Sequence, residues 1–475
     1  MIFSQGAGGG SLSTNKAPRS LQAQLQRAFR TIHSPGESLK ARMASSFVSI
    51  VGGDAYAQML RFAGNLILTR LLFPEAFGLM LVVNLVTTGM GMISDVGIQQ
   101  SVIIRSRERD ESFLHTAWTM KVARGFLIAV GCALLAVPLA HLYGMPELVW
   151  LLLISSIAPV ISGLESPQVM LHQRDVRMGR VTALTAISKT VSLTLTVGLV
   201  WAFPVVWMLA LNGLFDALTR TLMSYVMFPG ARPRFAWDRP SAAEIFRFGR
   251  WIFVGTLFTY LGSQADRLVV SQWMDPTMLG VYGIASAIPM MIKAQLKSIS
   301  SKLLFPAYRE LLDRPAEQFR ARVRQLRVGM LGLSTVPILI CAIGGAWMVD
   351  VLYDDRYARA GWIMQVLSAG TIFSALNLSA GPLLMAYGKS RKGMLLQIAR
   401  VSVSITAMVV GGTVWGVGGL ILAVAAADAI CQPLNYLATR EFNVRDWRVD
   451  LCFVLLMSTV IGAGWHAQGF RMVMP

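Results

Sequence analysis

Two short stretches with the same pattern decide the organisation of this chain: LFPEAFG at residues 72–78 and MDPTMLG at residues 274–280. Each links two long apolar segments, and proline and glycine recur in both links at the same spacing. Six apolar segments separate the first link from the second. Because an even number of membrane crossings preserves orientation, the pattern predicts two parallel repeats related by an axis along the membrane normal.

The composition around these links is that of a membrane protein. Apolar residues make up 54% of the 475 residues and charged residues 14%, whereas a soluble domain has about 25% charged residues. This composition excludes a soluble globular enzyme and a disordered chain. The long apolar runs also exclude a β-barrel, whose strands alternate apolar and polar residues. The sequence therefore predicts an all-α polytopic membrane protein.

Thirteen segments are apolar over the roughly 20 residues that a membrane-spanning helix needs. They lie at 47–72, 76–103, 116–141, 147–170, 180–203, 204–228, 247–273, 277–305, 326–350, 360–386, 393–413, 416–437 and 450–467. Together with the repeat, they predict two six-helix bundles and one extra C-terminal span.

The repeat divides the chain into five predicted parts. They are a basic N-terminal tail (1–46), an N-terminal bundle (47–228), a connector (229–246), a C-terminal bundle (247–437) and the extra span (438–475). The tail has no apolar core near Met1, so we expect no cleaved signal peptide. Its apolar residues at 21, 25, 29 and 32 share one helical face, which fits either a helix on the inner leaflet or a partly ordered tail.

The charges of the loops alternate along the chain. Lys and Arg number 43 against 25 Asp and Glu, a net charge of +18. In a soluble protein this excess would suggest a nucleic-acid partner, which we do not expect for membrane spans. The basic loops are 16–42, 105–109, 174–180, 232–239, 309–327, 389–392 and 440–448. Since cytoplasmic loops collect Lys and Arg, we predict a cytoplasmic N-terminus and, with an odd span count, an external C-terminus.

Neither cysteines nor histidines form a recognisable site. Cys132, Cys341, Cys431 and Cys452 lie in apolar runs without metal-ligand or CxxC spacing. The five histidines are scattered. We therefore expect no disulfide framework, metal, cofactor or catalytic residue.

Charged residues inside the predicted spans are the candidate functional residues, because a charge costs several kcal/mol at the bilayer centre. They are Asp54, Arg61, Arg70, Asp95, Lys121, Arg124, Lys189, Asp216, Arg220, Asp266, Arg267, Lys293, Lys297, Arg400 and Asp428. Basic groups outnumber acidic ones in this set, which favours an anion-lined cavity over a cation path.

Several of these charges also have a structural interpretation. Asp216 and Arg220 are four residues apart, so a local ion pair is expected. Lys121, Arg124 and Lys297 lie near the cytoplasmic ends and are expected to snorkel into the interface. Asp95 precedes Val96-Gly97 and either satisfies a loosened helix turn or binds an ion. Arg61 lies near mid-span with little opportunity to snorkel, and Arg267 need not pair with its neighbour Asp266 because adjacent helical residues point about 100° apart.

Short motifs occur along the chain in the order and spacing of a known family. They are TRLLFPEAFG (69–78), DVGI (95–98), QRDVR (173–177), DRLVV (266–270), LGVY (279–282), LFP (304–306) and LMAYG (384–388). From Phe47 to Tyr436 the chain resembles the Wzx-type polysaccharide-biosynthesis flippases of the multidrug/oligosaccharidyl-lipid/polysaccharide exporter superfamily.

The resemblance implies two six-helix bundles in a V shape. By alternating access they would move an undecaprenyl-diphosphate-linked oligosaccharide from the inner to the outer leaflet of the bacterial inner membrane, for surface polysaccharide or exopolysaccharide synthesis. On this resemblance Arg70 matches the family's basic residue before the Leu-x-Pro link, and Asp266-Arg267 match its Asp-Arg pair. The implied partners are the lipid-linked substrate, membrane lipids, a polysaccharide polymerase and export machinery.

The chemistry of a diphosphate head group points to particular residues. Arginine pairs with phosphate oxygens in a bidentate manner, so Arg61, Arg70 and Arg267 are the predicted substrate contacts. Asp54, Asp95, Asp266 and Asp428 are predicted to serve either ion coupling or structure.

Two other function classes stay open. A cation-coupled exporter of small amphiphilic drugs has the same architecture, but a cationic drug needs acidic residues where this chain has an excess of basic ones. A membrane enzyme, such as a polysaccharide polymerase or an acyltransferase, needs a carboxylate pair or a catalytic histidine near a membrane face. The one adjacent carboxylate pair, Asp354-Asp355, lies in a predicted outward loop, and we interpret it as solvated.

Overall fold

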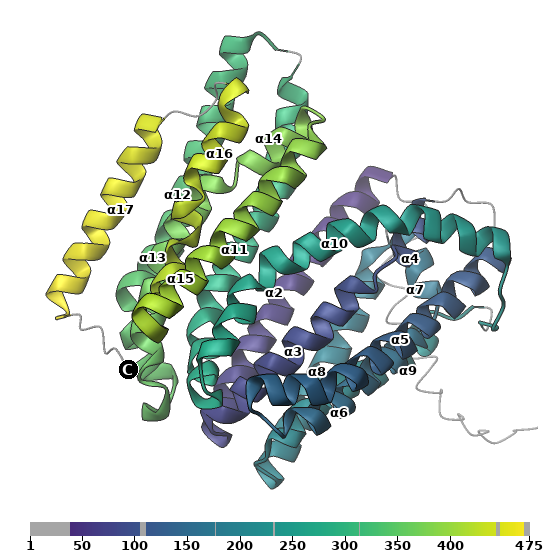
Figure 1. The fold of residues 1–475 in the computed structure, drawn as a ribbon. Coiled ribbons are helices and arrows are strands. Elements are labelled where there is room, and N and C mark those ends of the chain that lie inside the picture. The colour runs from purple at the N-terminus through teal and green to yellow at the C-terminus, as the bar shows by residue number, and fades with distance from the viewer. Residues whose placement is uncertain are drawn as a thin grey trace, which may run out of the picture.

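The computed structural model describes residues 39–104, 111–175, 177–230, 233–312, 314–442 and 447–469. Within these residues the regular structure is entirely helical. Two groups of helices meet at the bottom of Figure 1 and diverge toward the top, and α10 runs obliquely between them. The predicted tail helix at 21–32 and the basic loop 105–109 lie outside the described residues.

The N-terminal group contains eight helices. They are α2 (Leu39–Leu71), α3 (Pro74–Ile93), α4 (Ile98–Ile104), α5 (Glu111–Tyr143), α6 (Leu148–Gly163), α7 (Gln168–Arg174), α8 (Met178–Ala202) and α9 (Val206–Met227). The segments 76–103 and 147–170, each predicted as one span, are both interrupted, by the α3–α4 and the α6–α7 break.

The second group follows the long helix α10 (Arg239–Trp273). It contains α11 (Pro276–Leu311), α12 (Ala316–Leu352), α13 (Ala360–Asn377), α14 (Ala380–Ala386), α15 (Ser390–Ile430), α16 (Gln432–Thr439) and α17 (Trp447–Ala467), with 3-10 turns at Asp355–Tyr357 and Arg440–Phe442. The predicted connector 229–246 is therefore partly helical, because α10 begins at Arg239.

Every predicted span coincides largely with helix, although 360–386 is interrupted between α13 and α14. The segments 393–413 and 416–437 share α15, and the second continues into α16. Gly416 has φ 61° and ψ −150°, which interrupts α15. A Cβ on Gly411 would lie 2.7 Å from the carbonyl oxygen of Gly419, so the two halves of α15 turn back on each other. Glycine at these positions permits the turn and the close approach.

By length and composition, 8 helices in the described part are suited to cross a membrane, or up to 9 if the bent pair α6 and α7 is one span. The α15 hairpin counts once in that number. Helices α2, α9 and α10 are not among them, and each carries charged residues within its predicted span. The charged residues within these three helices must therefore be explained by their contacts in the structure.

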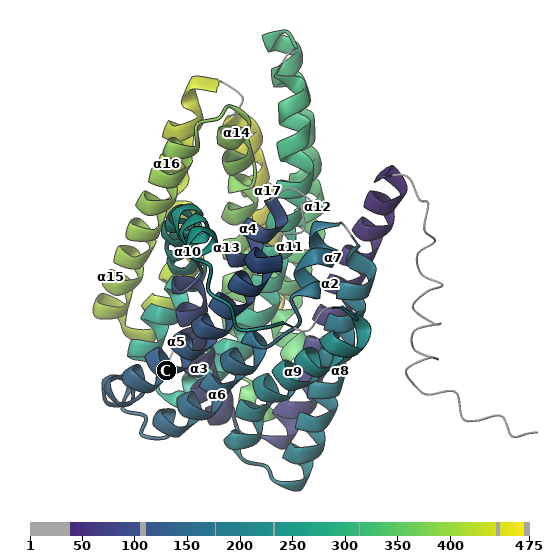
Figure 2. The same ribbon diagram turned by 90° about the vertical axis from the view of Figure 1, so that its right-hand side faces the viewer.

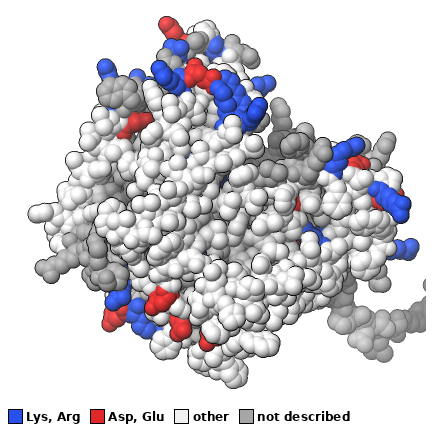
Figure 3. Space-filling model, in the orientation of Figure 1, with Lys and Arg blue, Asp and Glu red and all other residues white. Residues whose placement is uncertain are grey.

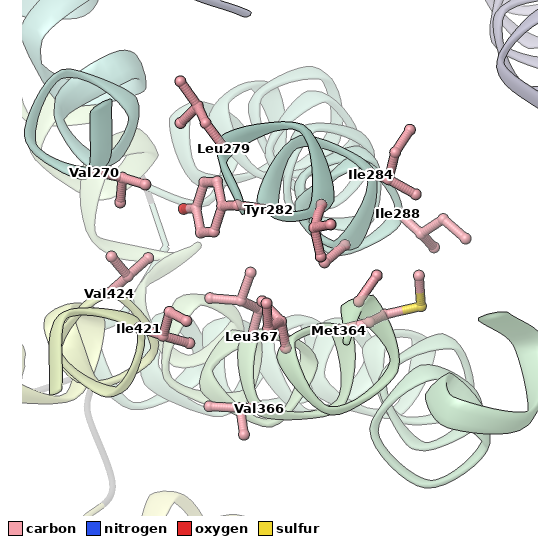
Figure 4. Packing of buried hydrophobic residues seen from close by; sticks show 14 of the residues in the cluster. Val270, Leu279, Tyr282, Ile284, Ile288, Met364, Val366, Leu367, Ile421 and Val424 are labelled. Carbon is pink, nitrogen blue, oxygen red and sulfur yellow. The ribbon is translucent and has the colours of Figure 1, made fainter. Parts of the chain in front are cut away.

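The core of the second group joins α10, α11, α13 and α15 (Figure 4). Tyr282 of α11 is fully buried and belongs to the same cluster as Val270 of α10 and Ile421 of α15 (Figure 4). A Cβ on Gly370 of α13 would lie 2.3 Å from the carbonyl oxygen of Ala425, so α13 and α15 pack backbone to backbone. Such close packing supplies the van der Waals contact that stabilises helices against each other in lipid.

The two short links contact each other reciprocally. A Cβ on Gly78 would lie 1.9 Å from the carbonyl oxygen of Pro276, and a Cβ on Gly280 would lie 1.8 Å from that of Pro74. At an interface with two-fold symmetry each contact occurs twice, once from each side. This contact supports the predicted repeat and joins the two groups of helices at one end.

Several helices extend beyond their predicted spans on the basic side. Helix α12 begins at Ala316 and α11 continues to Leu311, so both carry arginines past the apolar segment. In Figure 3, charged residues of both signs gather at the top, right and bottom, with Lys and Arg prominent at the top and right, and an almost uncharged band lies between. On the basic side, hydrogen bonds from Lys389 and Lys392 hold the pKa of the Glu441 carboxyl below its usual value.

Candidate functional site

A polar stripe runs along α2. It consists of Asp54, Gln58, Arg61 and Asn65, whose intervals of four, three and four residues place them on one helical face. Asp54 and Arg61 are exposed, and neither has a hydrogen-bond or ion-pair partner among the described residues. A guanidinium near mid-membrane without a protein partner requires water or a ligand beside it.

The stripe does not face the neighbouring helix α8. That contact is made by other residues of α2: a Cβ on Gly53 would meet Thr182, a Cβ on Gly64 would meet Leu193, and the Tyr56 hydroxyl lies 2.7 Å from that of Thr190. These residues occupy a different face from Arg61. Packing against α8 therefore leaves the polar stripe free.

The three predicted substrate arginines do not lie on one surface. Arg61 and Arg70 are nine residues apart in the unbroken helix α2, and at about 100° per residue their side chains project from opposite faces. The Arg70 carbonyl instead accepts a hydrogen bond of 3.4 Å from Arg356, whose guanidinium lies 5.0 Å from the centre of the Phe73 ring. Arg70 thus belongs to the contact between the links and the α12–α13 loop.

Asp266 and Arg267 on α10 have separate partners. Asp266 is buried and accepts a hydrogen bond of 2.9 Å from the Tyr282 hydroxyl. Arg267 is half-buried and donates to Gln264 Oε1 at 3.2 Å and to the Met290 sulfur at 3.3 Å, while its Nε has no partner within the described chain. Asp266 is therefore a packing residue, and Arg267 retains hydrogen-bonding capacity.

Asp95 lies in the break between α3 and α4. Its carboxylate accepts the backbone N–H of Gly97 at 3.0 Å, and Gly97 has φ 64°. Arg124 approaches Asp95 to 3.7 Å and donates to Ser94 Oγ at 3.1 Å and to the Gly91 carbonyl. These contacts favour the helix-turn interpretation of Asp95, and the expectation that Arg124 snorkels is wrong because the break offers it acceptors.

Glu165, in the break between α6 and α7, is a charged residue that the sequence interpretation missed. It is largely buried, with Lys121 Nζ at 2.7 Å and Arg220 Nε at 2.8 Å. Arg220 also donates to Thr185 Oγ1 at 3.0 Å. The one available sequence signal was a glutamate before Ser166-Pro167, because proline disfavours helix at the preceding residue.

Glu165 overturns two predictions. Lys121 does not snorkel, because a buried carboxylate lies within reach of its amine. Asp216 and Arg220 do not pair along their helix, because Arg220 binds Glu165 while Asp216 binds Lys189 of α8 at 2.7 Å. Contacts between helices thus replace contacts within one helix.

Asp428 is the corresponding centre of charge in the second group. Arg400 lies 2.8 Å and Lys293 lies 3.3 Å from its carboxylate, and the Ser374 hydroxyl also donates to it. Arg400 and Asp428 lie in the predicted spans eleven and twelve, as Lys189 and Asp216 lie in spans five and six. The two ion pairs therefore occupy matching positions in the two predicted repeats.

Among the described residues, no group of three or more His, Cys, Asp or Glu side chains could hold a metal ion. The four cysteines are free. What the arrangement offers is one unpartnered mid-span guanidinium, Arg61, and a second with spare capacity, Arg267. Both suit an oxyanion ligand.

This fold, with its long apolar helices, defines a multi-pass helical membrane protein, and sequence comparison gives its family. Residues 67–361 match the polysaccharide biosynthesis protein family, which covers more than half of the chain. The chain belongs to that family.

Two relatives are identical to the chain at about a quarter of the aligned positions. The chain is 23% identical over 372 residues to the lipopolysaccharide biosynthesis protein WzxC of Escherichia coli (strain K12), covering 78% of this chain and 75% of WzxC. It is 24% identical over 311 residues to the succinoglycan biosynthesis transport protein ExoT of Rhizobium meliloti (strain 1021), covering 65% of this chain and 62% of ExoT.

Two solved structures share the fold. The inward closed conformation of the lipid II flippase MurJ superposes with a TM-score of 0.67 at 10% identity, covering 90% of this chain and all of MurJ. An inward-facing multidrug resistance MATE family transporter of the MOP superfamily gives a TM-score of 0.56 at 12% identity, covering 86% of this chain and 95% of the transporter. The predicted all-α membrane fold is confirmed.

Proposed function

We propose that this protein is a flippase that moves a polyprenyl-diphosphate-linked oligosaccharide from the inner to the outer leaflet for surface polysaccharide or exopolysaccharide synthesis. Its family and the names of its relatives support this function. The observation that carries the mechanism is Arg61, an unpartnered guanidinium near the middle of a predicted span. A diphosphate head group is the ligand that such a residue suits, since arginine binds phosphate oxygens with two parallel hydrogen bonds.

The two groups of helices contribute one arginine each in this mechanism. Arg61 of α2 and Arg267 of α10 contact the diphosphate while it crosses the low-dielectric region, and the lipid tail stays in the bilayer. Rocking of the bundles exposes the head group first to one side and then to the other. The reciprocal Gly78–Gly280 contact supports an outer end that is closed in this conformation. Arg70 stabilises that end through its link and does not contact the substrate.

The carboxylates divide into two groups by their partners. Asp95, Asp266 and Asp428 each have a hydrogen-bond or ion-pair partner, which supports structural roles. Asp54 has none among the described residues, so we propose Asp54 as the coupling residue if transport uses an ion gradient.

A cation-coupled drug exporter is the second candidate, favoured by the likeness to the MATE fold. The pairing of Asp428 with two cations opposes it, because a cationic drug would meet net positive charge there.

We further propose that the protein lies in the bacterial inner membrane with the N-terminus and the basic loops in the cytoplasm. The alternation of basic and nearly uncharged loops supports this orientation, because cytoplasmic loops collect Lys and Arg. Exposed Trp150, Trp201 and Trp347, near helix ends on the side of the Pro74 and Pro276 links, fit a membrane–water interface on the proposed outer side. A polysaccharide polymerase and export machinery are the expected partners on that side.

The orientation can be tested by cysteine labelling in intact cells. In a cysteine-free background, Phe73→Cys and Asp275→Cys should react with a membrane-impermeant maleimide from outside, and Lys389→Cys only after the inner membrane is opened. Phe73 precedes α3 in the first link and Lys389 precedes α15 in a basic loop, which the proposed topology places on opposite sides of the membrane, so each serves as a control for the other. Labelling of Lys389→Cys alone in intact cells would reverse the topology.

The head-group contacts can be tested in cells that lack the natural gene copy. Truncating one partner of a buried charged contact typically costs about 2–5 kcal/mol, so Arg61→Ala and Arg267→Ala should each lower head-group binding more than tenfold. Arg→Lys variants keep the charge but lose the two-pronged geometry and should fall between wild type and alanine. The measurements are surface polysaccharide and the inner-leaflet pool of lipid-linked intermediate.

Controls separate binding from folding. Arg391→Ala removes an exposed arginine at the basic end of α15 and should leave both readouts unchanged. Arg70→Ala should also leave both readouts unchanged, because the Arg70 side chain is exposed and its contact with Arg356 is made by the backbone carbonyl. Arg61→Ala and Arg267→Ala proteins that fold normally and still support full surface polysaccharide would refute the proposed contacts.

A further inference from the structure

The segment before α10 is fastened to α5 along its backbone. Residues 233–238 have no regular secondary structure, and three of their N–H groups donate to side chains at the start of α5. The pairs are Arg234 N to His115 Nδ1 at 3.3 Å, Ala236 N to Thr119 Oγ1 at 3.1 Å and Asp238 N to Thr116 Oγ1 at 3.1 Å. This segment therefore has a fixed position on the N-terminal group and is not a loose linker.

The first turns of α10 continue the same attachment. Asp238 caps the helix by accepting the backbone N–H of Ser241 at 2.9 Å. Ala242 and Ile245 are buried against α4 and α5, and a Cβ on Gly249 would lie 2.1 Å from the carbonyl oxygen of Val96. Residues 233–249, called the strap here, thus form one surface element of the N-terminal group.

The outward surface of the strap combines large aromatic rings with arginines. Phe235 is 71% exposed, Trp237 57%, Phe246 51% and Phe248 38%. The exposed arginines are Arg234, Arg239 and Arg247. Aromatic rings beside arginines are typical of segments at a membrane interface, where the rings enter the head-group region and the guanidinium groups meet lipid phosphates.

We propose that the strap binds anionic phospholipid head groups of the inner leaflet. The three arginines supply charge complementary to those head groups, and the four rings supply the apolar contact that a surface facing only water would not favour. Its place on α5 fits this role, because α5 begins on the basic side of the protein.

The strap also lies at one end of the helix that connects both groups. Further along α10, a Cβ on Gly262 would lie 2.3 Å from Gln397 Nε2 of α15, so this part of α10 packs on the second group. Figure 1 shows α10 extending from the N-terminal group to the second one. Lipid binding at the strap therefore holds the N-terminal end of α10 at the membrane surface while the groups move.

Two measurements on the full-length protein test this proposal. The protein is placed in nanodiscs of phosphatidylcholine alone or with one quarter phosphatidylglycerol, and thermal unfolding is followed. Phosphatidylglycerol should raise the unfolding temperature of the wild type, and R234Q/R239Q/R247Q should lose most of that rise. A matched triple variant, R320Q/R322Q/R391Q, removes three exposed arginines that are not in the strap and should keep the rise.

The second measurement locates the aromatic face. A spin label at Trp237→Cys in a cysteine-free background should be relaxed by oxygen more than by a water-soluble nickel chelate. Full retention of the phosphatidylglycerol effect in R234Q/R239Q/R247Q would overturn the proposal. A label reached mainly by the nickel chelate would place the strap in water, and a label reached by neither reagent would indicate a protein partner; either result also overturns it.

Discussion

Gly280→Ala should separate the Pro74 and Pro276 links and abolish flipping. The added Cβ would lie 1.8 Å from the carbonyl oxygen of Pro74, whereas real Cβ atoms essentially never come within 3.0 Å of such an atom. The obstacle is backbone on both sides, so no side chain can rotate away and the α3 and α11 ends must separate. Overpacking of this kind costs about 1–3 kcal/mol or more, and we expect the upper end of that range.

The measurements are thermal stability and labelling of Phe73→Cys from outside, which should become faster in the variant. Gly78→Ala should behave in the same way, because its Cβ would meet Pro276 at 1.9 Å. Gly198→Ala is the control, since a Cβ there meets nothing within 4 Å. Wild-type stability and full surface polysaccharide in Gly280→Ala would show that the reciprocal contact is not required.

Glu165→Gln should destabilise the N-terminal group strongly. The substitution keeps the shape of the side chain but leaves Lys121 and Arg220 without the carboxylate that lies 2.7 and 2.8 Å from them. Removing one partner of a buried ion pair typically costs about 3–5 kcal/mol, because the remaining charges stay desolvated. Thermal unfolding in detergent and the yield of folded protein measure the effect.

A second variant shows whether unpaired charge is the cause. Lys121→Met added to Glu165→Gln removes one of the two stranded cations and should recover part of the stability. Glu310→Gln removes an exposed carboxylate of α11 and should change stability little. A Glu165→Gln protein that unfolds at the wild-type temperature, or no recovery in the double variant, would contradict the proposed role of the cluster.

Arg61 shows how far a single sequence can nominate a candidate site residue. Its charge stands out within an apolar run, and the cost of burying an unpaired guanidinium is a local property that needs no knowledge of neighbours. Arg70 satisfied the same criterion, but helical periodicity in the unbroken α2 directs it to the opposite face. The assumption that α2 would present both arginines to one cleft ignored that rotation.

Glu165 shows the opposite case. Its own segment gives no indication of a partner, and both cations come from helices far away in the sequence. The prediction of an Asp216–Arg220 pair used the nearest residues on one helix, yet inter-helix partners were closer in space. In lipid, a polar group that finds a partner on a neighbouring helix contributes more to stability than one left on a lipid-facing surface. The packing of the helices therefore decides which charged residues pair.

The sequence by itself determined that the chain forms apolar helices, where the helices begin and end to within a few turns, and which loops carry positive charge. These are properties of short segments, because the bilayer requires each span to satisfy its own backbone hydrogen bonds. The tertiary structure alone decided where predicted spans are broken, the contact between the Pro74 and Pro276 links, and which charges meet. Those features depend on the rotation and approach of helices distant in sequence, and only close packing of the whole chain fixes them.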